Sequence, residues 1–267
     1  MLIIRNKKIE FYKRKEKDLK TLLIIAGSDS SGGAGIQADI KTAEAFGVFS
    51  TTAITVLTAQ NTTGVKSIEP VSVGFLHDQI EMIMSDFRID AIKIGMLFNK
   101  ELISSLGSFL ERVNLPVVLD PVFLSKAGAN LLEVDAVEEL KKLFKYATLI
   151  TPNQKEAIVL FGKELKVDAP SPVLIKHFVK NSHSLDRLYY PDGKMVDFES
   201  LKLETKNLHG SGCSYSTAIA SNLALGKSLE DAIKISKKFI YEAILNAPNL
   251  GKGPGPLAHK IGGNSAT

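Results

Sequence analysis

The sequence has 267 residues, of which 45% are hydrophobic and 23% are charged, a composition that fits one large α/β domain. Its single cysteine excludes a disulfide framework and a zinc site built from several cysteines, and no apolar run approaches the roughly 20 residues of a membrane span. We therefore expect a cytoplasmic protein that binds no membrane.

The net charge of +4 comes from the first 20 residues, which hold eight basic and three acidic side chains. The other residues carry 25 basic and 26 acidic side chains, so we expect no nucleic-acid partner. The same 20 residues lack the apolar core of a signal peptide. We interpret residues 1–20 as a solvated basic extension, or as an added edge strand at Met1 to Ile4. A domain over 21–260 and a loose tail over 261–267 follow.

The first predicted strand, Thr21 to Ala26, ends in a glycine-rich loop that precedes a helix from Ile36 to Phe46. Residues 33–38 fit the dinucleotide pattern G-x-G-x-x-A, but the next strand, about Thr51 to Leu57, ends without the acidic residue that would hold a ribose. The loop also has the glycine spacing of a P-loop but lacks its Lys-Ser/Thr pair. We therefore expect the loop to bring backbone close to some other ligand.

Further short apolar runs predict strands that are separated in most cases by helical segments: Ala91 to Ile94, Val117 to Leu119, Ala147 to Ile150 and Val173 to Ile175. This pattern is typical of a parallel sheet covered on both faces. Each run ends on residues unlike its interior. Because the carboxyl ends of parallel strands meet at one edge of the sheet, we expect a ligand crevice there.

Near the end of the chain, a predicted hairpin and a predicted helix lie on either side of residues 207–216. Residues 189–194, Tyr-Tyr-Pro-Asp-Gly-Lys, predict a hairpin turn between two strands. Ser228 to Leu245 predicts a helix whose apolar residues form one stripe, as in a helix that covers a sheet. The intervening stretch 207–216 carries the most distinctive chemistry of the chain.

Residues 207–216 predict a tight turn that feeds a helix running to Gly226. The glycines on either side of Ser211 let the backbone aim several N–H groups at one point, and the positive end of the helix dipole adds to their field. We expect an anion hole in which the pKa of the Cys213 thiol is lowered. The alternative is an ordinary helix start with Ser211 as its cap and Cys213 as a small buried side chain.

Six separated motifs resemble those of the hydroxymethylpyrimidine/phosphomethylpyrimidine kinases of thiamine biosynthesis, within the ribokinase superfamily. The motifs are residues 25–39, 58–62 (TAQNT), 93–96 (KIGM), 119–122 (LDPV), 151–156 (TPNQKE) and 209–213 (HGSGC). The resemblance implies a three-layer α/β/α ribokinase-like fold with a mainly parallel central sheet. It also implies a homodimer that, with Mg²⁺, transfers the γ-phosphoryl group of ATP to a hydroxymethyl aminopyrimidine and then to the resulting monophosphate.

The same resemblance assigns catalytic roles to residues 210–213. Gly210, Ser211 and Gly212 would line the anion hole that receives the transferred phosphoryl group. Cys213 stands where many ribokinase relatives have a catalytic aspartate. Its thiolate would therefore accept the proton of the acceptor hydroxyl.

Gln60 is the predicted reader of the pyrimidine. Its amide offers a donor and an acceptor side by side, which complements the ring nitrogen and amino group of an aminopyrimidine. The resemblance also places Gly27, Asp39, Met96 and Val122 around the substrate, with the methionine and valine packing against the ring.

On the nucleotide side, Asn153 and Glu156 match the N-x-x-E motif of the superfamily, and Glu156 is expected to act on Mg²⁺ through water. Lys176 falls where the family places a lysine near the ATP phosphates, and Asp120 is a further candidate metal contact. These residues also fit plainer roles as a helix start, a surface lysine and a strand stop. The family usually has two glycines and a histidine after that lysine, whereas here His177 follows directly.

Two other functions remain open on the sequence. A pyridoxal kinase shares the Gly-x-Gly-Cys hole and phosphorylates the hydroxymethyl group of a pyridine, although Gln60 favours the aminopyrimidine. A nucleotide or vitamer sensor would keep the pocket without the transfer apparatus. The presence of Asn153, Glu156, Lys176 and Cys213 together argues against a sensor.

Overall fold

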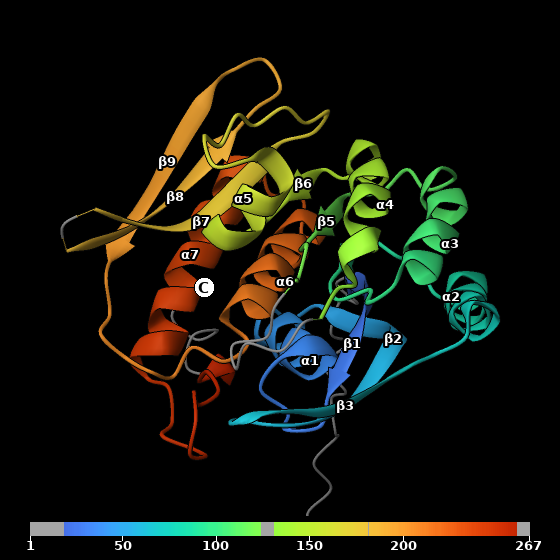
Figure 1. The fold of residues 1–267 in the computed structure, drawn as a ribbon, viewed down its shortest axis with the longest axis horizontal. Coiled ribbons are helices and arrows are strands. Elements are labelled where there is room, and N and C mark those ends of the chain that lie inside the picture. Colours follow the sequence, from blue (N-terminus) through green and yellow to red (C-terminus); the bar gives the residue numbers. More distant parts are fainter. Residues whose placement is uncertain (1–18, 124–130, 181, 261–267) are drawn as a thin grey trace, which may run out of the picture.

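The structure, a computed structural model, describes residues 19–123, 131–180 and 182–260 (Figure 1). The predicted extension over 1–20, apart from its last two residues, and the predicted tail over 261–267 lie outside this description, as does the suggested strand at Met1 to Ile4. Among the described residues, no helix is long and apolar enough to cross a membrane.

One sheet of nine strands forms the centre of the molecule, in the order β3-β2-β1-β4-β5-β6-β7-β8-β9. The strands are β1 Thr21–Asp29, β2 Phe49–Asn61, β3 Gly64–Pro70, β4 Ala91–Ile94, β5 Val117–Leu119, β6 Leu149–Ile150, β7 Val173–Lys180, β8 His183–Tyr189 and β9 Met195–Leu201. Six neighbouring strands pair in parallel: β2, β1, β4, β5, β6 and β7. At one edge β3 pairs antiparallel with β2, and at the other edge β8 pairs antiparallel with β7 and β9 with β8. The predicted mainly parallel sheet is confirmed.

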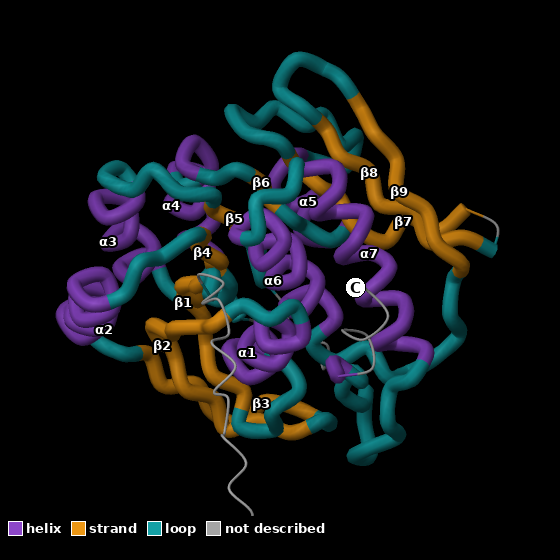
Figure 2. Tube along the Cα trace, turned by 180° about the vertical axis from the view of Figure 1, so that it is seen from behind, coloured by secondary structure: helices purple, strands orange, loops and turns teal. Residues whose placement is uncertain are grey.

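Helices cover both faces of the sheet (Figures 1 and 2). They are α1 Gly35–Ala45, α2 Val73–Asp86, α3 Lys100–Leu110, α4 Val137–Lys142, α5 Gln154–Phe161, α6 Ser211–Ala224 and α7 Leu229–Leu245, with short 3₁₀ turns at Val134–Ala136 and Phe144–Tyr146. Successive side chains of a strand point to opposite faces. Leu23 and Ile25 of β1 therefore join a core with α2 to α5, whereas Leu22 and Ile24 join one with α1, α6 and α7. The result is the expected three-layer α/β/α fold.

The predicted strands and helices are found with small shifts of their ends. The hairpin predicted at 189–194 joins β8 to β9, and Ser228 caps the predicted last helix by accepting a hydrogen bond from the N–H of Asp231. Strand β3 was not predicted. It pairs with an extended β2 through a turn at residues 62–63, in a segment whose exposed, polar sequence gives no apolar run.

Candidate active site

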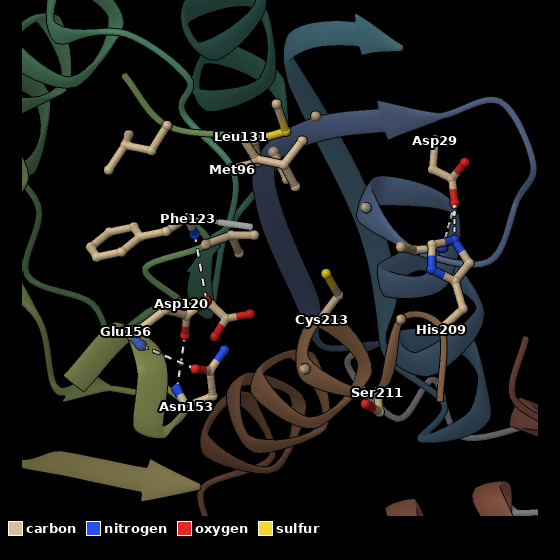
Figure 3. Close-up of a pocket in the computed structure, with 18 of the residues that line it drawn as sticks. Asp29, Met96, Asp120, Phe123, Leu131, Asn153, Glu156, His209, Ser211 and Cys213 are labelled. Carbon is tan, nitrogen blue, oxygen red and sulfur yellow. Dashed lines mark hydrogen bonds and ion pairs between the residues drawn. The ribbon is translucent and has the colours of Figure 1, made fainter. Parts of the chain in front are cut away.

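The carboxyl ends of the parallel strands and the start of α6 enclose a cavity of about 790 Å³. Every predicted site residue lines it except Asp39. Figure 3 shows its plan: Asp29 and His209 lie on one side, Asp120, Asn153 and Glu156 lie on the other, and Cys213 lies between them. The topology has therefore brought residues from all six motifs into one cavity, as the crevice argument predicts.

Apolar side chains wall one part of the cavity. Met96 packs with Val56 and Leu131 in a small buried cluster, against which Val122 also packs. Gly27 makes room for this wall, because a Cβ at that position would come within 2.7 Å of Val56 Cγ2 and 3.1 Å of Met96 Sδ. The arrangement suits a flat ring held between short apolar groups.

Gln60 lies at the end of β2, beside this wall. Its backbone N–H donates to Ser30 Oγ and its carbonyl accepts from the same hydroxyl, both at 2.8 Å. Its side-chain nitrogen lies 3.5 Å from His209 Nε2. The hairpin tip just beyond is tied to the C-terminal turn, since the N–H of Gly253 donates to Thr62 Oγ1 at 3.1 Å. Gln60 is thus held at the cavity by its backbone, and its side-chain oxygen also accepts from Thr58 Oγ1 at 3.3 Å.

Asp29 and His209 form a buried pair to which the sequence analysis gave no role. His209 Nε2 lies 2.8 Å from Asp29 Oδ2, and Asp29 also accepts the backbone N–H groups of Ser31, Gly33 and Ala34. Burial on its own would raise the pKa of Asp29, but the hydrogen bonds from His209 and Ser31 outweigh it and lower the pKa to about 2. The pair ties the loop after β1 to the loop before α6. Both residues stand inside the recognised motifs, which is the only signal that the sequence offers for them.

The turn before α6 has the shape expected of an anion hole. Gly210 is the N-cap residue in the left-handed conformation, with φ +79°, and a Cβ there would overlap the carbonyl oxygen of Gly33. No side chain caps the helix, so the alternative role of Ser211 as cap is not found. The first N–H groups of α6 have no partner inside the helix and lie at its positive end. Ser211, Gly212 and Cys213 all line the cavity, and the N–H of Ser211 also donates to the carbonyl of Leu208 at 3.2 Å.

The expectation of a lowered thiol pKa is wrong. Burial raises the pKa of Cys213 to about 11, and the Lys93 ammonium opposes this effect only in part. The prediction weighed the helix start alone. In the folded protein the loss of hydration and the carboxylates of Asp39 and Asp120 raise the pKa by more than the Lys93 ammonium and the N–H of Gly35 lower it.

The predicted contact of Asp39 with the substrate also needs correction. Asp39 is fully buried on α1 and does not line the cavity. Its carboxylate accepts Lys93 Nζ at 2.7 Å and Thr217 Oγ1 at 2.6 Å. Lys93 lines the cavity in its place, reaching inward from β4. The sequence shows that an aspartate sits on this helix but not that a lysine from another strand occupies the space in front of it.

A second buried ion pair marks the other end of the cavity. Lys176 Nζ lies 2.8 Å from Asp120 Oδ1, which also accepts Thr151 Oγ1 at 2.9 Å. Asn153 and Glu156 form a reciprocal capping box at the start of α5, so the predicted helix start is present as well. Burial raises the pKa of Glu156 to about 7; Lys176 opposes this and Asp120 adds to it.

Two carboxylates at this end could share a divalent cation with a nucleotide. The described residues contain no cluster of three or more candidate ligands, so they hold no complete protein cage. Mg²⁺ normally keeps several waters and takes one or two carboxylates together with substrate phosphates. Asp120 and Glu156 therefore fit Mg²⁺, and a cation beside Glu156 would favour its ionised form.

His177 follows Lys176 at the cavity wall in a conformation that residues other than glycine rarely adopt, with φ +70°. The side chain of Asp186 accepts its N–H at 2.9 Å, and the side chain of Gln154 donates to its carbonyl at 2.6 Å. These two bonds hold the strained backbone in place. The residue that directly follows Lys176 therefore has a left-handed conformation although it is not glycine.

Comparison with known proteins places this site in a family. A sequence model of the family described as phosphomethylpyrimidine kinase matches residues 29–258. The chain belongs to that family. The hydroxymethylpyrimidine/phosphomethylpyrimidine kinase of Haemophilus influenzae is 41% identical, over 91% of this chain and 97% of its own. That of Bacillus subtilis is 38% identical, over 89% of this chain and 93% of its own.

Solved structures agree with the fold. The pyridoxal kinase from Staphylococcus aureus in complex with ADP superposes with a TM-score of 0.81 at 30% identity, over 91% of this chain and 94% of its own. The phosphomethylpyrimidine kinase from Clostridium difficile gives 0.71 at 38% identity, over 85% of this chain and 99% of its own. The second is closer in sequence and the first in overall shape.

Proposed function

We propose that this protein is an ATP-dependent kinase that phosphorylates 4-amino-5-hydroxymethyl-2-methylpyrimidine and then its monophosphate, which yields the diphosphate used in thiamine biosynthesis. One observation carries the proposal. An apolar wall with Gln60, the start of α6 and a buried cluster of Lys176, Asp120 and Glu156 line a single cavity. Membership of the phosphomethylpyrimidine kinase family supports the same activity, as does the similarity to the hydroxymethylpyrimidine/phosphomethylpyrimidine kinase of Haemophilus influenzae.

The acceptor end favours an aminopyrimidine. The carboxamide of Gln60 can donate to a ring nitrogen of the pyrimidine while it accepts from the neighbouring amino group. Met96 and Val122 line the same cavity. An analogue without that edge would leave a polar group unpaired in a partly buried site. The site therefore discriminates by hydrogen bonding as well as by shape.

The transfer end supplies charge and position. Phosphoryl transfer depends chiefly on alignment and on neutralising charge, which the N–H groups at the start of α6 and the Lys176 ammonium provide. Glu156 and Asp120 would hold Mg²⁺, which when bound neutralises phosphate charge. Cys213 lines the same cavity, and its thiolate would take the proton of the acceptor hydroxyl in the first transfer. The second acceptor is a phosphate that is already ionised and has no such proton to lose.

The decisive assay measures ADP release with Mg-ATP and each of three acceptors: the hydroxymethylpyrimidine, its monophosphate and pyridoxal. We expect a higher kcat/KM for the pyrimidine than for pyridoxal, and no activity in excess chelator. Equal or better turnover of pyridoxal would favour the second candidate, pyridoxal kinase, which the TM-score of 0.81 supports. Binding of nucleotide without ADP release would instead indicate a sensor.

Two further proposals follow from the resemblance and concern the state of the protein rather than its chemistry. We propose a homodimer in the cytoplasm. Sedimentation of the purified protein tests the dimer, and fractionation of cells tests the location. All the residues used above come from one chain.

A further inference from the structure

A buried lysine, Lys93, lines the cavity, and the phosphoryl transfer proposed above gives it no role. Lys93 of β4 is fully buried, and its Nζ lies 2.7 Å from Asp39 Oδ2. The other oxygen of Asp39 accepts Thr217 Oγ1 at 2.6 Å. Three elements, β4, α1 and α6, thus fix one ammonium group. Removing both charges from water costs free energy that their attraction need not recover. The presence of this buried pair is therefore weak evidence that its role is only to stabilise the fold.

The backbone makes room for this ammonium. Gly95 follows two residues after Lys93, and a Cβ at that position would lie only 2.7 Å from Lys93 Nζ. Any larger residue would push the ammonium aside. The glycine of the KIGM motif therefore keeps Lys93 Nζ at the cavity wall.

Lys93 is linked through Asp39 to α6, the helix that carries Cys213. Thr217 lies one helical turn after Cys213, on the same face of α6, and it is the residue that Asp39 binds. Lys93 and Cys213 also line the same cavity. The charge of Lys93 is the strongest of the influences that lower the pKa of Cys213, and the thiolate in turn raises the pKa of Lys93.

We propose that Lys93, fixed by Asp39, is a positioning residue that stabilises the thiolate form of Cys213 when the acceptor is a hydroxyl group. The inference rests on the proposed function for the reaction that the thiolate serves. The acceptor oxygen forms a bond to the γ-phosphorus, and the bond from phosphorus to the bridging oxygen of ADP breaks, with the electron pair staying on ADP. The acceptor proton moves to Cys213 Sγ and then to water.

The thiol lies among charges of both signs. Lys93 from β4 lowers its pKa, whereas Asp39 from α1 and Asp120 after β5 raise it, and Lys176 from β7 also interacts with it. The two members of the buried pair therefore act in opposite directions on one thiol. Neutralising Asp39 alone should make the thiolate more accessible, and neutralising both members should remove the help of Lys93.

The test uses the chain's single cysteine, because alkylation by iodoacetamide then reports Cys213 alone. The rate is measured against pH in the protein without substrates, and its midpoint gives the thiol pKa. We expect Asp39→Asn to move the midpoint down by about one unit, which is about tenfold in rate at pH 8. The double variant Lys93→Met/Asp39→Asn should lie above Asp39→Asn by at least as much. Lys93→Met alone is avoided, because it would leave the Asp39 carboxylate buried with only the Thr217 hydroxyl and without its counter-ion.

A matched control is the pair Lys20 and Asp90, 2.8 Å apart beside the amino end of β1, at the other end of the sheet. Lys20→Met/Asp90→Asn should leave the alkylation midpoint unchanged. Equal midpoints for Asp39→Asn and the Lys93 double variant would overturn the proposal. If the double variant does not fold, an unchanged or raised midpoint in Asp39→Asn overturns it as well. Failure of the kinase assay would refute the proposed function and leave this titration valid.

Discussion

The two acceptors of the proposed reaction differ at the oxygen that attacks phosphorus, and we expect the side chain of Cys213 to distinguish them. A hydroxymethyl group must lose a proton during the transfer, whereas a phosphate monoester offers an oxygen that is already charged. With the thiol pKa raised to about 11, the resting protein holds a neutral thiol at pH 7, so the thiol must ionise before it can accept a proton in the first transfer. The first transfer should therefore depend on the chemistry of Cys213 far more than the second.

Replacing Cys213 by alanine tests this difference. We expect kcat with the hydroxymethyl acceptor to fall by about 10²- to 10⁴-fold, because the proton acceptor is lost. KM for ATP should change little, since the backbone N–H groups of α6 remain. Turnover of the monophosphate should fall much less. Steady-state kinetics on both acceptors measure the split.

Cys213→Asp serves as the control for this variant. A carboxylate is ionised at neutral pH and should restore part of the first transfer, with the acid limb of its pH profile at lower pH than in the wild type. If alanine keeps the full rate on the hydroxymethyl acceptor, the thiol only packs, and positioning with the anion hole accounts for catalysis.

At the scale of elements, the start of α6 and the loop after β1 fit together through two glycines. Gly210 lies against the carbonyl oxygen of Gly33, and a side chain at Gly33 would overlap the ring of His209. His209 in turn holds Asp29. The anion hole and the acceptor side of the cavity are therefore positioned by one contact between two loops.

The variant Gly210→Ala should disrupt this contact. The added Cβ overlaps backbone and also requires a left-handed φ, so we expect a loss of about 1–3 kcal/mol in stability. The displaced N–H groups should lower kcat as well. Urea denaturation and steady-state kinetics measure the two effects.

Gly107→Ala is the matched control. Gly107 lies inside α3, where a Cβ meets nothing within 4 Å, so alanine should stabilise the helix by up to about 1 kcal/mol and leave kcat unchanged. A Gly210→Ala protein that behaves like this control would show that the two loops have room to separate.

Much of the sheet could be predicted because buried parallel strands are short apolar runs, and runs such as Ala91–Ile94 and Val117–Leu119 were found to the residue. β3 was missed because an exposed edge strand carries no such run. Asp39 and Cys213 were misjudged for a different reason. Their surroundings come from β4, β5 and α1, so the loss of hydration and the facing charges follow from the fold and not from neighbouring residues in the chain.

At the scale of the whole molecule, His259 links stability to pH. It is buried near the C-terminal end of the described chain, with Nε2 2.9 Å from Ser214 Oγ of α6. Burial, with a smaller effect from Lys41, lowers its pKa from 6.5 to about 4. The unfolded chain therefore binds a proton between these two values and the folded protein does not.

We expect the stability that depends on His259 to be lost as pH falls from about 6.5 to about 4, by up to about 3 kcal/mol. Glu156 acts in the opposite direction, because its pKa is raised to about 7 and it favours the folded state at lower pH. The free energy of unfolding of the wild type against pH would thus combine the opposite contributions of His259 and Glu156. Urea denaturation of the wild type and of His259→Gln, at pH 7 and pH 5, isolates the histidine as the difference between their slopes. Parallel slopes would contradict the prediction.

The pair of Asp29 and His209 joins residues 180 positions apart, and the bond from Gly253 to Thr62 spans 191. On a translating ribosome, β1 and the β2–β3 hairpin therefore emerge long before the segments that complete them. At about 5–20 residues per second, Asp29 is synthesised roughly 10 to 40 s before its histidine. A nascent chain halted before residue 209 can have most of its sheet and still lack His209, so we expect the site to form only after that residue has been synthesised.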